Sequence, residues 1–272
     1  MRIKQALNLA KESLKDHKNE AVFILCEYLK KDKIWLYLNE ELEFDEKPYF
    51  DLISRFKKGE PFEYIFKKAY FYNFEFYVEN GVLIPRYDSE ILLVKLIDLC
   101  KKNNFKNILE IGFGSGILSI ILAKELSLKI TACDISTKAL EIAKKNAKIH
   151  KVDHLIDFIL CDFRDLKYNK FDLIFSNPPY IKNDYKLDKW VLNEPKEALF
   201  GGEKGYEILE EIIKFSFSNN VKYLACEFGY DQKEILQEIL NKNFYQSQFF
   251  KDERGFNRAF WAILKGEINE SN

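Results

Sequence analysis

The chain has 272 residues, enough for one large domain and a smaller companion, and 47% of them are hydrophobic, so a sizeable buried core is expected. Lys and Arg number 42 and Asp and Glu number 43, which gives a formal net charge of −1. Because proteins that bind duplex nucleic acid usually present a basic surface to the phosphates, this balance disfavours DNA as the main partner.

Cysteine usage and hydropathy indicate a reducing, cytoplasmic compartment. The five cysteines are scattered without a CxxC pair and the three histidines lack ligand spacing, so we expect free thiols and no metal site. Charged residues interrupt positions 2–15, where a signal peptide needs an apolar core. No apolar run approaches the ~18 residues of a membrane span, and we expect no membrane attachment.

Apolar residues recur at helical spacing through the first 66 residues. Nothing in this stretch supplies a catalytic constellation, so residues 1–66 are predicted to form a helical domain that holds or recognises a substrate. Helices are predicted over 3–14, 21–29, 33–42 and 49–58.

An aromatic-rich segment joins this domain to the rest of the chain. Residues 67–86 are predicted to form a linking β-hairpin, with Asn80-Gly81 as its turn. Pro85 closes the second strand, and Asp88 or Ser89 is placed to cap a helix that runs from about residue 90 to 101.

Strand and helix patterns alternate over residues 87–272, and short, wholly apolar strands are typical of a parallel sheet covered on both faces. The last two strands have only an Arg254-Gly255 turn between them, so they must be antiparallel. We predict an α/β domain with a doubly wound, mostly parallel seven-stranded sheet and a C-terminal antiparallel hairpin. Strands are predicted over 107–111, 129–133, 157–161, 171–176, 221–227, 246–251 and 258–264, and helices over 116–126, 137–149, 204–218 and 231–241.

A glycine-rich turn follows the first of these strands. Its GxGxG spacing after an acid, Glu110, differs from the GxGxxG of dinucleotide sites and suits a ligand with an amino-acid group. Asp134 at the next strand end is placed for two ribose hydroxyls, while Asp162 suits an adenine amino group and Phe163 a stacking role. A turn used only for packing, with the aspartates as caps, is the alternative. The predicted cofactor-binding residues, for an adenosine-containing ligand, are Glu110, Gly112, Phe113, Gly114, Ser115, Gly116, Asp134, Ile135, Asp162, Phe163 and Asn177.

The fourth strand leads into Asn177-Pro178-Pro179-Tyr180, where two prolines fix a rigid extended turn. A planar NH2 nitrogen is a poor nucleophile because its lone pair is delocalised. If its two N–H groups donate to the Asn177 side-chain oxygen and the Pro178 carbonyl, the nitrogen is aimed at the cofactor, and Tyr180 can lie flat against the planar group. These four residues are predicted to be catalytic and to bind the substrate; a simple Pro-Pro strand terminator is the alternative.

The glycine motif and Asn177-Pro178-Pro179-Tyr180 together resemble the class I methyltransferases that act on planar NH2 groups. Over nearly its full length the chain resembles the HemK-type release-factor glutamine N5-methyltransferases, with further likeness in residues 82–90, 193–205, 227–232 and 252–258. The resemblance implies S-adenosylmethionine as methyl donor, S-adenosylhomocysteine as product, and the glutamine of the Gly-Gly-Gln tip of translation release factors as acceptor. It also implies that the helical domain docks another part of the release factor.

Two residues enter the predicted site through the resemblance. Arg86 and Glu194 lie in family segments and are predicted to bind the substrate, although an ion pair, a cap or a turn accounts for them equally well. Where the family continues with proline, glutamate and threonine, this chain has Tyr87, Asp88 and Ser89, which keeps the acid and the hydroxyl.

Three other functions are compatible with parts of the pattern. A methyltransferase acting on adenine N6, cytosine N4 or guanine N2 shares both motifs but must flip a base and bind phosphates, which the neutral charge disfavours. A noncatalytic nucleotide-binding adapter would not need Asn177 and Pro178 at this edge, and a dinucleotide oxidoreductase conflicts with the glycine spacing. We therefore expect an enzyme that acts as a monomer on release factors, without direct nucleic-acid binding.

Overall fold

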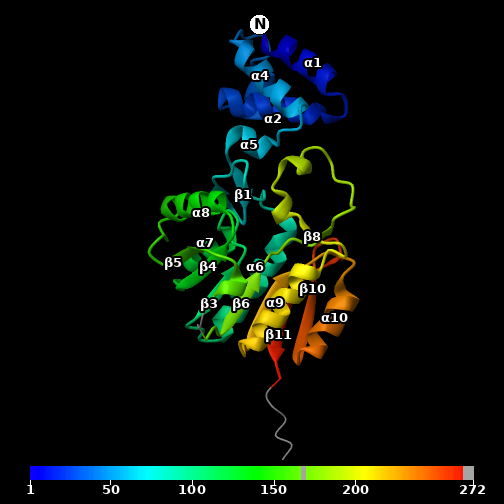
Figure 1. Ribbon diagram of the computed structural model, residues 1–272. Helices are drawn as coiled ribbons and strands as arrows, with labels where there is room; N and C mark the ends of the chain where they lie inside the picture. The colour runs from blue at the N-terminus through cyan, green and yellow to red at the C-terminus, as the bar shows by residue number, and fades with distance from the viewer. Residues whose placement is uncertain (167–169, 266–272) are drawn as a thin grey trace, which may run out of the picture. The chain divides into compact units, whose positions relative to one another are not determined.

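The structure is a computed structural model that describes residues 1–166 and 170–265 (Figure 1). Internal contacts divide the chain into two compact units, Met1–Lys68 with Asp188–Asn193, and Ala69–Leu187 with Glu194–Asn272. Within the described ranges, none of the helices combines the length and hydropathy that crossing a bilayer requires.

The first unit is a helical bundle with its own apolar core. Its helices are α1 (Ile3–Leu14), α2 (Lys18–Leu29), α3 (Lys33–Leu38), α4 (Glu46–Lys57) and α5 (Phe62–Phe66). The sequence did not predict α5. Helix α3 ends four residues before its predicted end, because the Asn39 side chain donates to the Trp35 carbonyl at 2.9 Å and closes the last turn. The segment 188–193 joins this core through Trp190, whose indole stacks on Phe56.

A short hairpin, β1 (Ala69–Phe71) and β2 (Phe74–Phe76), begins the second unit. The predicted turn at Asn80-Gly81 is wrong: the turn is Tyr72-Asn73, whose φ angles of 49° and 64° are those of a tight hairpin turn. The Asn146 side chain accepts from the Tyr77 N–H at 2.8 Å and donates to its carbonyl at 2.9 Å. This side chain takes the place of a strand partner, so the chain from Tyr77 onward runs as a loop.

The second unit contains a seven-stranded sheet in the order β10-β11-β9-β6-β3-β4-β5. Neighbours from β9 to β5 are parallel, and β11 pairs antiparallel with both β9 and β10. The predicted mostly parallel sheet with a C-terminal antiparallel hairpin is therefore confirmed. Its strands are β3 (Ile108–Ile111), β4 (Ile130–Asp134), β5 (Ile156–Leu160), β6 (Leu173–Ser176), β9 (Tyr223–Glu227), β10 (Tyr245–Lys251) and β11 (Asn257–Leu264).

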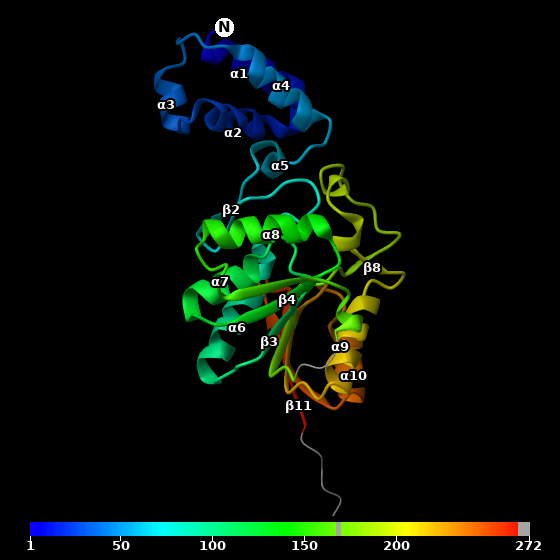
Figure 2. The same cartoon turned by 60° about the vertical axis from the view of Figure 1, so that its left-hand side comes forward.

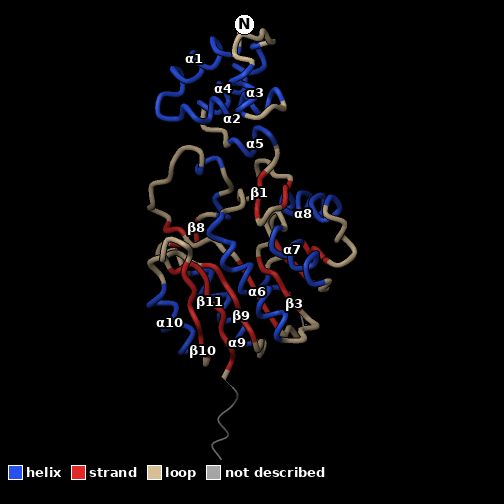
Figure 3. Tube along the Cα trace, turned by 180° about the vertical axis from the view of Figure 1, so that it is seen from behind, coloured by secondary structure: helices blue, strands red, loops and turns tan. Residues whose placement is uncertain are grey.

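Helices cover both faces of this sheet, as Figures 2 and 3 show. On one face lie α6 (Glu90–Lys102), α7 (Ile117–Leu126) and α8 (Thr137–Ile149), and on the other α9 (Glu207–Ser218) and α10 (Lys233–Lys242). From β3 the chain winds outward to β4 and β5, and then returns to the other side of β3 as β6. The direction of winding reverses between β3 and β6, which is where open α/β sheets bind ligands.

A second, two-stranded parallel pair was not predicted. Residues Ile181–Lys182 (β7), directly after the Asn-Pro-Pro-Tyr turn, pair with Phe200–Gly202 (β8). This pair anchors the loop that follows the turn to the body of the second unit.

Candidate active site

A pocket opens at the sheet edge where β3, β4, β5 and β6 end, inside the second unit. Most of the predicted site residues meet there, and all of these except Arg86 come from four separate strand ends. Its walls include Arg86, Glu110, Gly112, Phe113, Gly114, Ser115, Asp134, Ile135, Asp162, Phe163, Asn177, Pro178 and Pro179. Gly116, Tyr180 and Glu194 are not part of its wall.

The glycine turn after β3 presents bare backbone to the pocket. Gly112 and Gly114 have φ angles of 72° and 52°, and a Cβ on either would meet no atom within 4 Å. The Asp134 carboxylate at the end of β4 accepts from the N–H groups of Gly114 and Ser136, each at 2.9 Å. Burial raises the pKa of Asp134, and these N–H bonds oppose the rise. Asp134 at the end of β4 thus stabilises the glycine turn that follows β3.

Glu110 lies under this turn and is almost completely buried. Its carboxyl accepts a hydrogen bond from the Ser119 hydroxyl on α7. Burial raises the pKa of Glu110 to about 8, so a cation held nearby in the pocket would favour the charged carboxylate.

The end of β5 supplies Asp162 and Phe163. Asp162 caps a short 3-10 helix by accepting from the Arg164 N–H at 2.9 Å, and it pairs with the guanidinium at 2.6 Å, which lowers its pKa. The capping role left open by the sequence is therefore present. Phe163 is buried and packs edge-on against Phe215, with ring centroids 5.4 Å apart.

Asn177 follows β6, which Ser176 ties to β3 through a 2.7 Å bond to the Ile111 carbonyl. The Asn177 side-chain Nδ2 donates to the Ser89 hydroxyl at 3.0 Å. Its Oδ1 is buried and has no hydrogen-bond partner among the described residues. Because a buried, unpaired acceptor costs about 1–3 kcal/mol, such an atom marks a place where a donor binds.

Tyr180 is held at both ends. Its hydroxyl donates to Glu227 Oε1 at 3.0 Å, and its backbone carbonyl accepts from the Gln232 side chain at 2.9 Å. Burial, together with the neighbouring Glu227, raises the pKa of the Tyr180 phenol well above its usual value, so the hydroxyl stays protonated.

The chain is similar to protein families and relatives of known function. Residues 5–66 match the PrmC N-terminal domain family and residues 87–202 the methyltransferase small domain family. A release factor glutamine methyltransferase of Dictyoglomus turgidum is 39% identical over 264 residues, which are 90% of each chain. One of Aquifex aeolicus is 34% identical over 93% of this chain and 94% of its own length. The chain belongs to the release factor glutamine methyltransferase family.

Solved structures share this fold over about 70% of the chain. The hMettl16 catalytic domain in complex with an RNA hairpin matches with a TM-score of 0.57 over 71% of this chain and 76% of its own, at 17% identity. The ribosomal protein L11 methylase of Lactobacillus delbrueckii gives 0.52 over 70% and 84%, at 19% identity. Both show a class I methyltransferase fold for this chain, and at these identities they show nothing more.

Arg86 and Glu194 form an ion pair with each other. Glu194 is only 4% exposed and also accepts a hydrogen bond from the Ile84 N–H at 2.9 Å. It therefore holds residues 84–86, which precede α6, in place. The ion pair that the sequence left open is present, and a substrate contact of either residue remains a prediction.

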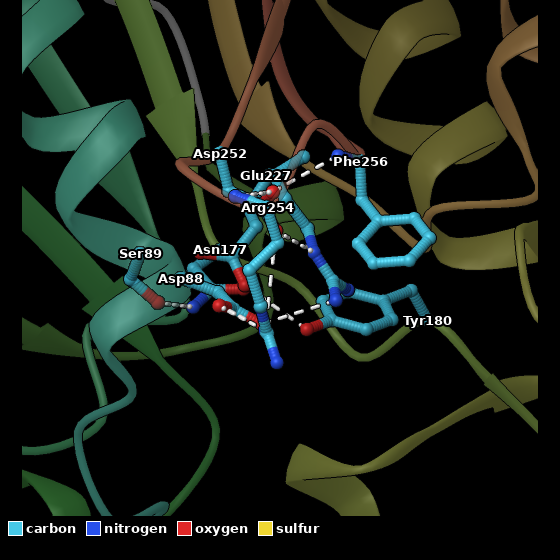
Figure 4. A network of polar contacts seen from close by, with 9 residues as sticks. Asp88, Ser89, Asn177, Tyr180, Glu227, Asp252, Arg254 and Phe256 are labelled. Atoms are coloured by element: carbon cyan, nitrogen blue, oxygen red, sulfur yellow. Dashed lines mark hydrogen bonds and ion pairs between the residues drawn. The ribbon is translucent and has the colours of Figure 1, made fainter.

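Ser89 and Glu227 lie beside Asn177 and Tyr180 (Figure 4). The sequence prediction gave neither of them a catalytic role. Ser89 was predicted as a helix cap, but its side chain makes no capping bond and meets Asn177 instead. Asp88, the other predicted cap, pairs with Arg254 at 2.7 Å and Arg258 at 3.1 Å. Glu227 is a carboxyl at the end of the wholly apolar run 224–226, and that mismatch was the signal available in the sequence.

Proposed function

We propose that this protein transfers a methyl group from S-adenosylmethionine to the N5 amide nitrogen of the glutamine in the Gly-Gly-Gln motif of peptide chain release factors. The observation that carries the proposal is the buried, unpaired Oδ1 of Asn177 in the wall of the same pocket as the glycine turn. Membership of the family supports this acceptor over a nucleic-acid base.

The pocket fits S-adenosylmethionine in three respects. The bare backbone of Gly112 and Gly114 leaves space for a ligand, Asp134 offers carboxylate lone pairs to ribose hydroxyls, and Glu110 favours a cationic end. Ile135 and Phe163 would border the adenine. When bound, the cofactor supplies a methyl group on a positively charged sulfur.

The chain's own contribution is to hold the acceptor nitrogen. The Asn177 Oδ1 and the Pro178 carbonyl accept the two N–H groups of the glutamine amide, which fixes the rotation of the amide plane. Both acceptors stabilise the positive charge that develops on the nitrogen as it is alkylated, so they favour the transition state over the ground state. The alkylated nitrogen becomes acidic and releases its proton to solvent, so no general base is required.

Residues 1–66 form the domain that recognises the release factor, residues 67–86 link it, and residues 87–272 carry the methyltransferase. Arg86 and Glu194 border the substrate side of the pocket. The protein acts in the cytoplasm as a monomer, with release factors rather than nucleic acid as its partners.

Purified protein incubated with radiolabelled S-adenosylmethionine and a bacterial release factor is expected to transfer label to the factor. Substituting the glutamine of the factor's Gly-Gly-Gln motif by alanine removes the acceptor nitrogen and should abolish transfer, as measured by scintillation counting and peptide mass spectrometry. Label in DNA or ribosomal RNA, with none in the release factor, would refute the proposal.

Asp134→Ala is expected to weaken S-adenosylmethionine binding about 100-fold, measured by titration calorimetry. Two hydrogen bonds to a charged acceptor are lost, at about 1.5 kcal/mol each, and the Gly114 turn loses its anchor. Asp157→Ala is the matched control, because Asp157 lies on β5 beside β4 with an exposed side chain. Equal affinity of the two variants would contradict the role of Asp134.

A further inference from the structure

We propose that Glu227 is a positioning residue that acts through Ser89 to set which way the side-chain amide of Asn177 faces. The proposal rests on the function proposed above and assigns a task to a buried carboxyl that the transfer itself does not use. When Glu227 is charged, the amide oxygen of Asn177 is left open for the substrate.

The register of the sheet brings Asn177 and Glu227 together. Ser176 of β6 pairs with Cys226 of β9, so Asn177 and Glu227 leave adjacent parallel strands at the same level. Ser89, at the start of α6, is 1% exposed and receives the Asn177 Nδ2 at 3.0 Å. Figure 4 shows Ser89 bonded to Asn177 and Tyr180 bonded to Glu227, with the two pairs close together.

The direction in which the Ser89 hydroxyl donates its proton determines which end of the Asn177 amide faces Ser89. The Ser89 hydroxyl has one proton, and a charged Glu227 can only accept. Glu227 Oε1 accepts a hydrogen bond from the Tyr180 hydroxyl, whereas Oε2 is buried and has no hydrogen-bond partner among the described residues. The Ser89 hydroxyl is also a donor to this carboxyl, and it favours the charged form of Glu227 more than the Tyr180 hydroxyl does. With its proton directed there, Ser89 offers a lone pair to Asn177, which must then present Nδ2 and leave Oδ1 free.

Protonation of Glu227 would remove this constraint. Burial raises the pKa of Glu227 to about 7; the hydroxyls of Ser89 and Tyr180 and the guanidinium of Arg258 oppose the rise, and Asp88 adds to it. A neutral Glu227 can itself donate, so the Ser89 proton is free to turn toward Asn177. The Asn177 side-chain amide can then flip and accept that proton at Oδ1, which occupies the acceptor that the substrate needs. Turnover should therefore increase with pH through about 7, as Glu227 loses its proton.

Glu227→Gln tests the proposal, because glutamine keeps the shape but can donate as well as accept. We expect kcat to fall at least 10-fold with the KM for S-adenosylmethionine within 2-fold of wild type, and the rise in kcat near neutral pH to disappear. Ser89→Ala should lower kcat similarly, and Ser89→Thr, which keeps the hydroxyl, should restore it. Glu238→Gln, on the exposed face of α10, is the control with the same chemical change.

A second measurement does not need transfer activity. In 15N-labelled protein the side-chain NH2 signal of Asn177, assigned by its loss in Asn177→Ala, should shift with pH at the midpoint of Glu227, and this shift should vanish in Glu227→Gln. Thermal unfolding identifies any variant that fails to fold. A pH-independent Asn177 signal in wild type, or Glu227→Gln and Ser89→Ala enzymes with wild-type kcat, would overturn the proposal. A wild-type enzyme that shows the pH-dependent signal but leaves release factors unlabelled would instead refute the proposed function alone.

Discussion

Asn177→Ala is expected to bind S-adenosylmethionine normally and to lose about 10²–10³ in kcat on a release factor, about 2.7–4 kcal/mol by comparison with removal of one oxyanion-hole donor. The Oδ1 of Asn177 has no hydrogen-bond partner among the described residues, so removing this atom breaks no hydrogen bond of the free enzyme. The loss of Oδ1 leaves the amide of the substrate glutamine free to rotate. It also removes a dipole that stabilises the positive charge developing on the glutamine nitrogen. Titration calorimetry and single-turnover kinetics separate the two effects.

The control is Asn219→Ala, because Asn219 caps the C-terminus of α9 through its side chain and lies away from the pocket wall. That variant should keep wild-type kcat even if it melts earlier. Should Asn177→Ala keep a rate within 3-fold of wild type, the clamp on the amide nitrogen would not exist. A parallel loss of cofactor affinity would mean that Asn177 serves the cofactor and not the acceptor.

The sheet and the pocket were predictable because their signals are local. Wholly apolar strands such as β6 and the GxGxG turn each lie within a few consecutive residues, and parallel pairing then brings Asp134, Asp162 and Asn177 to one edge. Sequence order alone therefore indicated which side chains would share the pocket, and the structure places all three in its wall.

What the sequence could not supply are pairings between distant positions. Ser89 meets Asn177 across 88 residues, and Tyr180 meets Glu227 across 47. A serine before a helix has the pattern of a cap, and only the fold shows that its hydroxyl faces another strand end. The hairpin turn was missed for a similar reason, because Asn146, far along the chain, satisfies the backbone of Tyr77 and ends the strand.

Gly205→Ala is expected to destabilise the protein and to reduce kcat about 10²-fold, the scale of a 1 Å misplacement at a reacting group. Gly205 has a φ of +86°, and a Cβ there would lie 2.7 Å from the Tyr180 carbonyl oxygen and 3.0 Å from the Lys182 N. Both are backbone atoms, so the substitution must displace the chain directly after Pro178 and Pro179. Chemical denaturation and steady-state kinetics on a release factor measure the two effects.

Gly255→Ala separates this steric effect from backbone strain. Gly255 also has a φ of +86°, but a Cβ there would meet nothing within 4 Å. Both variants should therefore share a conformational cost of about 1–2 kcal/mol in unfolding free energy. Only Gly205→Ala should add the cost of overpacking, about 1–3 kcal/mol, and lose turnover. If the two variants had equal kcat, the close approach of Gly205 to Tyr180 would not position the catalytic turn, and strain alone would explain why glycine occupies both positions.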